Sequence, residues 1–285
     1  MTVMALFRTS FFSACYQRNT KMNVILPVDN PLLPGETRDW GPFKTLYLLH
    51  GYRGNCDDWL NSSLIMEMSV QFNIAVVMAE GVNGFYVDQP NSGILGSEFI
   101  GRELIEVTRR TFPLSDKRED TLLGGLSMGG YGTLYNCLKH GGVFGHAIAL
   151  STPVKVLRYE SEYEPKDIGF RQTPGYFEAL HGDLTNIYET DRNIAFHAKQ
   201  VLDTGKPVTN LYMACGYNDV LVPENRELHE QLDDMGFPHV YEEGPGTHDW
   251  VFFNSFMRQG LVSILGEPEL PPHPFWVERS EYKWQ

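Results

Sequence analysis

Cysteine is scarce in this chain, with four among 285 residues, at positions 15, 56, 137 and 215. No two of them form a C-x-x-C pair, and four are too few for a disulfide framework in a chain of this length. This excludes a small disulfide-stapled scaffold. We expect four reduced thiols, with Cys137 and Cys215 in structural rather than nucleophilic roles.

Long hydrophobic runs are also lacking, since no window approaches 18 uninterrupted apolar residues. A membrane-spanning helix is therefore excluded. Residues 1–15 contain apolar stretches, but Arg8 interrupts them where a secretory signal would need an unbroken apolar core. We interpret this segment as an edge strand that leads into residues 21–27, and we expect a cytoplasmic location.

Positive charge is in deficit, with 23 Lys and Arg against 36 Asp and Glu, which gives a formal net charge of −13. Such a chain repels nucleic acid phosphates and anionic membrane surfaces, so neither is expected as a partner. The sequence also contains no internal repeat, low-complexity segment or linker. We expect one domain over residues 1–285, and a homo-oligomer stays open.

Short apolar runs alternate with helix-length segments along most of the chain. This pattern predicts an α/β fold, in which a mostly parallel central sheet has helices on both faces. The expected strands are residues 45–49, 74–78, 121–123, 146–150, 210–214 and 240–241. The expected helices are residues 97–112, 131–140 and 224–235.

Two regions depart from this alternation. Residues 152–204 are rich in Tyr, Glu, Pro and Gly, and we expect a cap-like insertion over the carboxyl edge of the sheet, where open α/β sheets bind ligands. Ordinary surface decoration is the alternative. Residues 268–285 show no periodicity and are expected to form an extended tail that wraps the domain or meets a partner.

The most informative motif is Gly-Leu-Ser-Met-Gly at residues 125–129, a G-x-S-x-G sequence between an expected strand and an expected helix. This context is typical of a nucleophile elbow, which holds a serine on a tight turn and needs small residues on both sides. Ser127 is therefore the candidate nucleophile.

A serine hydroxyl needs a neighbouring base, and the base needs an acceptor that orients it. His248 is the preferred base, because its loop follows the expected strand at residues 240–241. Asp219, directly after the strand at 210–214, is the preferred acid. The order Ser, Asp, His is that of α/β-hydrolases. Asp249 is the competing acid, but adjacent side chains in an extended loop point apart.

Acyl transfer also requires backbone donors for the oxyanion. The N–H of Met128, just after the nucleophile, is one candidate, and the N–H of Tyr52 in the glycine-containing loop 50–54 is the second. Residues 84–92 follow another strand and should border the pocket, where their aromatic side chains either hold substrate or pack within the loop. The candidate substrate contacts are His50, Gly51, Trp59, Tyr86, Asn91 and Trp250.

Taken together, these motifs resemble the esterase D-like branch of the α/β-hydrolases, and most closely the tributyrin esterase group related to carbohydrate esterase family 1. The resemblance rests on His50-Gly51, Asp58-Trp59, residues 125–132, residues 216–219 and residues 245–250. It implies an α/β-hydrolase fold and a triad of Ser127, Asp219 and His248. Related S-formylglutathione hydrolases more often carry His before the nucleophile, where this chain has Leu126.

The resemblance implies a serine carboxylesterase that acts on short acyl, acetyl-like or feruloyl esters, including those of plant-wall oligosaccharides. Catalysis would pass through an acyl-Ser127 intermediate and would need no metal or cofactor. The alternatives are a thioesterase similar to S-formylglutathione hydrolase, an acyltransferase to a sugar hydroxyl, and a catalytically silent binding module.

Overall fold

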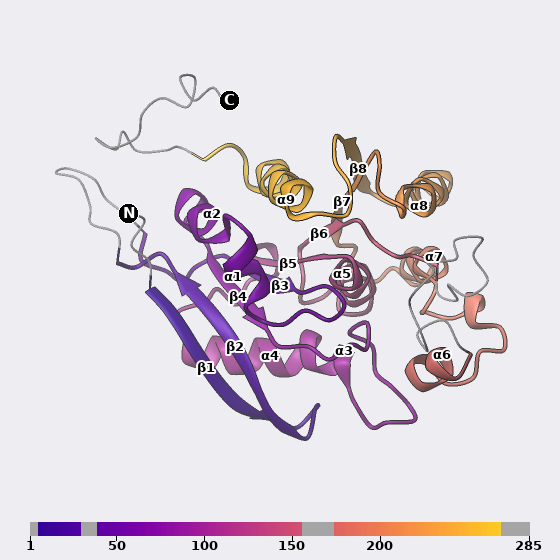
Figure 1. The fold of residues 1–285 in the computed structure, drawn as a ribbon, viewed down its shortest axis with the longest axis horizontal. Coiled ribbons are helices and arrows are strands. Elements are labelled where there is room, and N and C mark those ends of the chain that lie inside the picture. Colours follow the sequence, from indigo (N-terminus) through magenta and orange to yellow (C-terminus); the bar gives the residue numbers. More distant parts are fainter. Residues whose placement is uncertain (1–4, 30–38, 156–173, 269–285) are drawn as a thin grey trace.

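An eight-stranded sheet forms the centre of the computed structural model, which describes residues 5–29, 39–155 and 174–268. The strand order is β1-β2-β4-β3-β5-β6-β7-β8 (Figure 1). The strands are β1 Ala5–Ser13, β2 Arg18–Leu26, β3 Thr45–Leu49, β4 Ala75–Ala79, β5 Thr121–Leu126, β6 His146–Leu150, β7 Asn210–Gly216 and β8 His239–Gly244.

The sheet is mostly parallel, as predicted. Strands β3 to β8 pair in parallel, whereas β1 pairs antiparallel with β2 and β2 pairs antiparallel with β4. The predicted strands at residues 45–49 and 146–150 match β3 and β6 at both ends. The edge strand expected near the N-terminus is β1, which forms a long hairpin with β2 at one side of the molecule (Figure 1).

Helices cover both faces of the sheet. They are α1 Asp58–Ser62, α2 Ile65–Phe72, α3 Gly96–Glu98, η1 Phe99–Glu103, α4 Leu104–Thr111, η2 Arg118–Asp120, α5 Met128–Lys139, α6 Pro174–His181, η5 Ile187–Glu189, α7 Ile194–Thr204, α8 Val222–Asp234 and α9 Trp250–Leu265. Figure 1 shows α2 and α9 on one side of the sheet and α4 on the other.

Each face of the sheet has its own hydrophobic core. One core joins the sheet to α1, α2 and α9 through residues such as Trp59, Ile65 and Phe252. The other joins it to the helices α4, α5, α7 and α8 through residues such as Leu104 and Leu134. Because both faces are covered, the central strands β3 to β6 are buried along almost their whole length, which explains their continuous apolar sequences.

The helix predicted at residues 97–112 contains one wide turn, the π-helical η1, between α3 and α4. Gly101 lies in this turn, and a Cβ atom there would lie 2.3 Å from the ring of His140, the residue directly after α5. The wide turn therefore occurs where the helix backbone passes close to the side chain at the C-terminal end of α5. Sequence periodicity does not report such a contact.

The expected insertion over residues 152–204 contains α6, η5 and α7 in its described part, while residues 156–173 lie outside the described residues. Helix α7 contacts α5 and α8. The expected tail falls almost entirely on residues 269–285, which are also outside the description.

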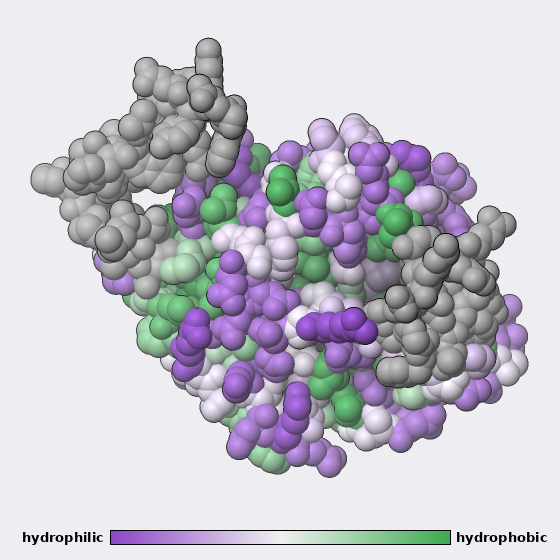
Figure 2. Space-filling model, viewed as in Figure 1, coloured by the Kyte–Doolittle hydropathy of each residue, from purple (hydrophilic) through white to green (hydrophobic). Residues whose placement is uncertain are grey.

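The four cysteines are all free and buried. Among the described residues, no helix is long and apolar enough to cross a membrane. The face shown in Figure 2 is mostly hydrophilic, and its hydrophobic residues form small separate groups.

Candidate active site

Ser127 occupies a tight turn between β5, which ends at Leu126, and α5, which begins at Met128. Its φ of 53° and ψ of −122° lie in a region that residues with a side chain rarely adopt. The Ser127 N–H donates to the carbonyl of Leu150 at 2.9 Å and so ties the turn to the end of β6. The turn has the strained backbone of a nucleophile elbow.

Two glycines of the motif are required by close backbone contacts. A Cβ atom on Gly125 would lie 2.5 Å from the carbonyl oxygen of Gly129, and one on Gly129 would lie 2.5 Å from the carbonyl oxygen of Leu49. Real side chains do not fit at such distances. The start of α5 can therefore pass directly against the ends of β3 and β5, which is the physical reason for glycine on both sides of Ser127.

His248 and Asp219 form a hydrogen-bonded pair, with 2.9 Å between His248 Nδ1 and Asp219 Oδ2. Asp219 follows β7 and is buried, whereas the His248 side chain, which follows β8, is 37% exposed. The rings of His248 and Phe253 form a T-shaped pair, with centroids 5.3 Å apart and an interplanar angle of 89°. The carboxylate and the aromatic ring thus hold the imidazole from two sides.

Asp219 stays ionised despite its burial. Burial by itself would raise the pKa of this carboxyl group, but the hydrogen bond and the charge of His248, together with the backbone N–H of Leu221, lower the pKa below its usual value. Because the folded-state pKa is lowered, the ionised group stabilises the fold at neutral pH, and this contribution is lost as the pH falls through the folded-state value.

Asp249, the competing acid, has another role. Its Oδ1 accepts hydrogen bonds from the backbone N–H groups of Val251 and Phe252 at 2.9 and 3.0 Å, and its Oδ2 accepts from Thr247 Oγ1 at 2.6 Å. It is therefore the N-cap of α9. Both of its carboxylate oxygens are engaged away from the His248 ring.

The three candidate triad residues lie at the same edge of the sheet, each just after the end of a strand. Ser127 follows β5, Asp219 follows β7 and His248 follows β8, and these strands run parallel in adjacent positions around β6. Within the described part of the chain, no hydrogen bond joins the Ser127 hydroxyl to the His248 ring. In enzymes without bound substrate the distance between the nucleophile and its base is often long, and it shortens when substrate binds.

The loop at residues 50–54 lies directly beside the serine turn. A Cβ atom on Gly51 would lie 2.8 Å from Leu126 Cδ1 and 3.7 Å from Ser127 Cβ. Tyr52 is half-buried in this loop, and Met128 is in the first turn of α5, where backbone N–H groups have no partner within the helix. The two candidate oxyanion donors therefore come from segments that meet at Ser127.

His50 is buried and uses both ring nitrogens internally. Its Nδ1–H donates to the carbonyl of Gly51 at 2.8 Å, and its Nε2 accepts from the N–H of Gly81 at 2.9 Å. Burial lowers the pKa of the ring, which keeps it neutral. The structure therefore places the His50 side chain as a brace between two loops, and its hydrogen-bonding capacity is used up there.

Tyr86 supports the same loop from the other side. It is fully buried, and its hydroxyl donates to the carbonyl of His50 at 2.9 Å. Burial raises its pKa well above the usual value, so the hydroxyl remains a donor. Phe85 and Tyr86 both have positive φ, of 55° and 57°, and the ring of Tyr86 lies where a Cβ atom on Gly132 would clash. Such strained residues persist only where neighbours hold them.

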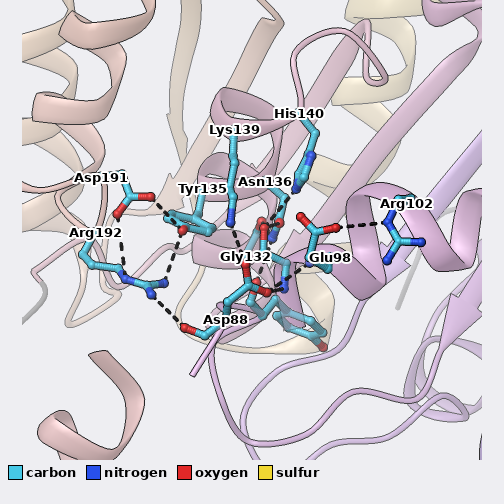
Figure 3. Close-up of polar contacts among 12 residues, drawn as sticks. Asp88, Glu98, Arg102, Gly132, Tyr135, Asn136, Lys139, His140, Asp191 and Arg192 are labelled. Carbon is cyan, nitrogen blue, oxygen red and sulfur yellow. Dashed lines mark hydrogen bonds and ion pairs between the residues drawn. The ribbon is translucent and has the colours of Figure 1, made fainter. Parts of the chain in front are cut away.

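Asp88 anchors the loop of Tyr86 to α5 and to the start of α3 (Figure 3). Its carboxylate accepts from Lys139 Nζ at 2.7 Å and from the backbone N–H groups of Ser97 and Glu98 at 2.9 and 3.1 Å. Burial would raise the pKa of Asp88, but these contacts outweigh it and lower the pKa. Arg192 adds a hydrogen bond to the Asp88 carbonyl at 2.8 Å.

The other predicted substrate contacts lie in different surroundings. Trp59 is buried and donates through Nε1 to the carbonyl of Leu49 at 3.1 Å. Trp250 is half-buried and packs edge-on against Trp59, with centroids 5.2 Å apart. Asn91 is exposed and donates to the carbonyl of Glu178 at 3.1 Å. Sequence reasoning did not point to Phe253, whose only signal is its place on the helix that follows His248.

Cavities are found elsewhere on the molecule. Two, of about 330 and 430 Å³, lie beside α7 and α8 and share Tyr188, Asn193 and Gln231. Neither is lined by any predicted site residue. The convergence of the candidate triad residues, rather than either of these two cavities, therefore identifies the candidate site.

The sheet, the strained serine turn and the acid–histidine pair together define an α/β-hydrolase of the serine type. The family model for esterases matches residues 13–264, and the chain belongs to that esterase family. An acetyl esterase of Caldicellulosiruptor saccharolyticus is 40% identical over 262 residues, which are 90% of this chain and 97% of the relative.

Two solved structures from Staphylococcus aureus are also similar. The fluorophosphonate-binding serine hydrolase F has a TM-score of 0.79 and 25% identity, with 92% of this chain and 98% of that chain covered. An S-formylglutathione hydrolase has a TM-score of 0.77 and 26% identity, with 92% and 99% covered. These findings confirm the predicted resemblance to esterase D-like α/β-hydrolases, and the protein is a serine esterase.

Replacing Asp219 by Asn should lower kcat by about 10³- to 10⁴-fold, because an amide no longer selects the imidazole tautomer that can take a proton from serine. Steady-state hydrolysis of p-nitrophenyl acetate checks this. Asp249→Asn is the matched control, since it keeps a capping side chain and should retain most of the turnover. Equal losses in the two variants would refute the choice of Asp219. In Asp219→Asn the thermal unfolding midpoint should also depend less on pH in the acid range, because the carboxylate that is protonated there is missing.

Tyr86→Phe should reduce both stability and turnover. It leaves the buried His50 carbonyl without its donor, at a cost of about 1–3 kcal/mol in the free energy of unfolding, and it loosens the loop that carries Tyr52. We expect kcat to fall more than KM rises. Urea unfolding and steady-state kinetics measure the two effects.

Tyr47→Phe is the control for this variant. Tyr47 is equally buried and hydrogen-bonds Thr108 on α4 at 2.8 Å, away from the loop. It should lose stability with little change in kcat. If both variants lowered kcat alike, Tyr86 would have no special part in holding the loop.

Proposed function

We propose that this esterase hydrolyses short acyl esters through an acyl-enzyme, with Ser127 as the nucleophile, His248 as the base and Asp219 as the residue that orients the base. The single observation that carries the assignment is the 2.9 Å contact between His248 and Asp219 at the sheet edge that also bears the strained Ser127 turn. Nucleophile, base and orienting acid are the three parts that the chemistry needs.

In the first half of the reaction the Ser127 oxygen attacks the ester carbonyl while its proton passes to Nε2 of His248. The imidazolium then gives this proton to the departing alcohol, and the acyl group remains on the serine. In the second half water attacks the acyl carbonyl as His248 takes its proton, and the serine leaves with that proton to restore the enzyme. Asp219 stabilises the positive charge on the ring in both halves.

The oxyanion of each tetrahedral intermediate would bind the N–H groups of Met128 and Tyr52. The position of Gly51 against Ser127, and of Met128 at the start of α5, supports this pairing. The N-terminus of α5 also places the positive end of the helix dipole near the developing charge. Donors fixed before the reaction cost no reorganisation, which is why such sites lower the barrier.

We place acetyl-like esters first among the substrates. The supporting observation is the 40% identity to an acetyl esterase over almost the whole of both chains. Feruloyl esters and plant-wall oligosaccharide esters remain part of the proposal through the family resemblance. The thioesterase alternative is favoured by the structural similarity to an S-formylglutathione hydrolase, whereas Leu126 before the nucleophile favours oxygen esters.

Helix α6 supports the expectation that residues 152–204 help to form the substrate pocket. Its residues Tyr176, Phe177 and Leu180 form a small hydrophobic cluster that packs against Tyr52 and Phe85. Tyr52 belongs to the candidate oxyanion loop, and Phe85 belongs to the loop of Tyr86, which supports it. We therefore propose that this part of a single hydrolase domain borders the bound acyl or alcohol group.

Ser127→Ala should lower turnover of p-nitrophenyl acetate by at least about 10⁴-fold, because the acyl-enzyme can no longer form. The free energy of unfolding should not fall, since alanine is no larger than serine at this turn. Ser255→Ala, on the exposed side of α9, is the control and should keep full turnover. Turnover like that of the unmodified protein in Ser127→Ala would refute the mechanism.

A substrate panel distinguishes the acyl classes. We expect kcat/KM to be highest for p-nitrophenyl acetate and to fall with p-nitrophenyl butyrate and then methyl ferulate. Each substrate should require Ser127, which is checked with the alanine variant. A higher kcat/KM for S-formylglutathione would replace the oxygen-ester assignment by the thioesterase, and a higher value for methyl ferulate would make the enzyme a feruloyl esterase.

A further inference from the structure

Two histidines and one carboxylate meet where α8 packs beside β8. His229 and Asp233 lie one turn apart on α8, and His239 is the first residue of β8. His229 Nδ1 lies 2.8 Å from His239 Nε2, while Asp233 lies 3.6 Å from His229 Nε2 and 3.8 Å from His239 Nε2. One ligand atom from each residue falls within 4.8 Å of the other two.

The orientation of His239 is fixed by the backbone. Its Nδ1–H donates to the carbonyl of Phe237 at 2.8 Å, so its Nε2 accepts the hydrogen bond from His229 Nδ1–H, and an ion bound between the two rings would replace that proton. A ring N–H bonded to a backbone carbonyl is the usual arrangement of a metal-ligating histidine, because it sets the tautomer and the direction of the free nitrogen. The side chain of His239 is only 2% exposed, which adds to its rigidity.

His229 is also held in place, but it remains accessible. Its ring packs on that of Tyr241 with centroids 4.9 Å apart, and 35% of the side chain is exposed. The Asp233 side chain is 64% exposed and can move toward the rings. An ion can therefore reach the cluster from solvent, and one flexible carboxylate can close around it.

We propose that His229, Asp233 and His239 bind a divalent transition-metal ion, with Zn²⁺ as the representative probe. Imidazole nitrogens and one carboxylate suit Zn²⁺ and its neighbours in the first transition row, whereas Mg²⁺ and Ca²⁺ prefer oxygen ligands. Two Zn–N bonds of about 2.1 Å in a tetrahedral site set the nitrogens about 3.4 Å apart, so the rings separate by roughly half an ångström on binding.

The ion would act on stability rather than on the chemical step. Helix α8 begins just after the Asp219 turn, and β8 ends just before the loop that carries His248. Asp233 and His239 lie at the other ends of these two elements, and a bound ion would link them there. Because the ion binds the folded chain, its binding free energy adds to folding stability. This proposal stands independently of the proposed esterase mechanism.

The test uses the full chain after removal of metals with a chelator. Titration with ZnCl₂ by calorimetry should show one saturable Zn²⁺ per chain, and the thermal unfolding midpoint should rise with Zn²⁺ concentration. MgCl₂ and CaCl₂ should do neither. Co²⁺ at the same site should give visible absorption bands, a signature that a general effect of salt cannot produce.

Variants locate the site. His239→Gln and Asp233→Asn should each weaken Zn²⁺ binding at least about tenfold. Asp234→Asn, which removes the same charge from the neighbouring exposed residue, should bind like the parent. His229→Gln is a second ligand variant at a partly exposed position, so a folding defect in His239→Gln does not prevent a result.

His248→Ala separates this cluster from the catalytic histidine. It should keep the full Zn²⁺ affinity and the full thermal shift, because its ring is not a ligand in the proposed site. Loss of Zn²⁺ binding in His248→Ala, unchanged binding in both His229→Gln and His239→Gln, or no saturable binding to the parent would each overturn the proposal.

Discussion

The close contact between the start of α5 and the ends of β3 and β5 determines the geometry of the whole site. A Cβ atom on Gly129 would lie 2.5 Å from the carbonyl oxygen of Leu49, so no residue with a side chain fits there. This contact brings Ser127, Met128 and the loop after β3 to one point. The candidate nucleophile and both candidate oxyanion donors are therefore placed by a single packing constraint on the backbone.

Strain at this point is supported by buried polar contacts around it. Ser127, Phe85 and Tyr86 all have positive φ, which the chain adopts only because neighbouring groups stabilise it. The side chains of Tyr86 and His50 connect the strained loops through hydrogen bonds to backbone groups, and Asp88 anchors them to α5. The rigid part of the site is thus a set of buried hydrogen bonds behind the residues that would react.

Much of the fold and the candidate triad could be predicted from sequence because their signals are local. The buried parallel strands are continuous apolar runs, and β3 and β6 were predicted with both ends correct. Ser127, Asp219 and His248 each follow such a run, so the rule for parallel sheets places them at one edge.

Side-chain direction and partners were less predictable, because they depend on contacts between distant segments. Trp59 and Tyr86 appeared as possible pocket residues, but the structure buries both and directs their polar atoms to backbone carbonyls. The wide turn at Gly101 and the pairing of His229 with His239 depend equally on helix packing. Periodicity describes one element at a time, and none of these contacts lies within one element.

The central claim is that the strained turn presents an activated serine, and the most direct measurement is the site of covalent labelling by a fluorophosphonate. We expect the intact mass to increase by one adduct and peptide mapping to locate it on Ser127. In His248→Ala the labelling rate should fall by orders of magnitude. An adduct on another residue, or labelling that is equally fast without His248, would contradict the account.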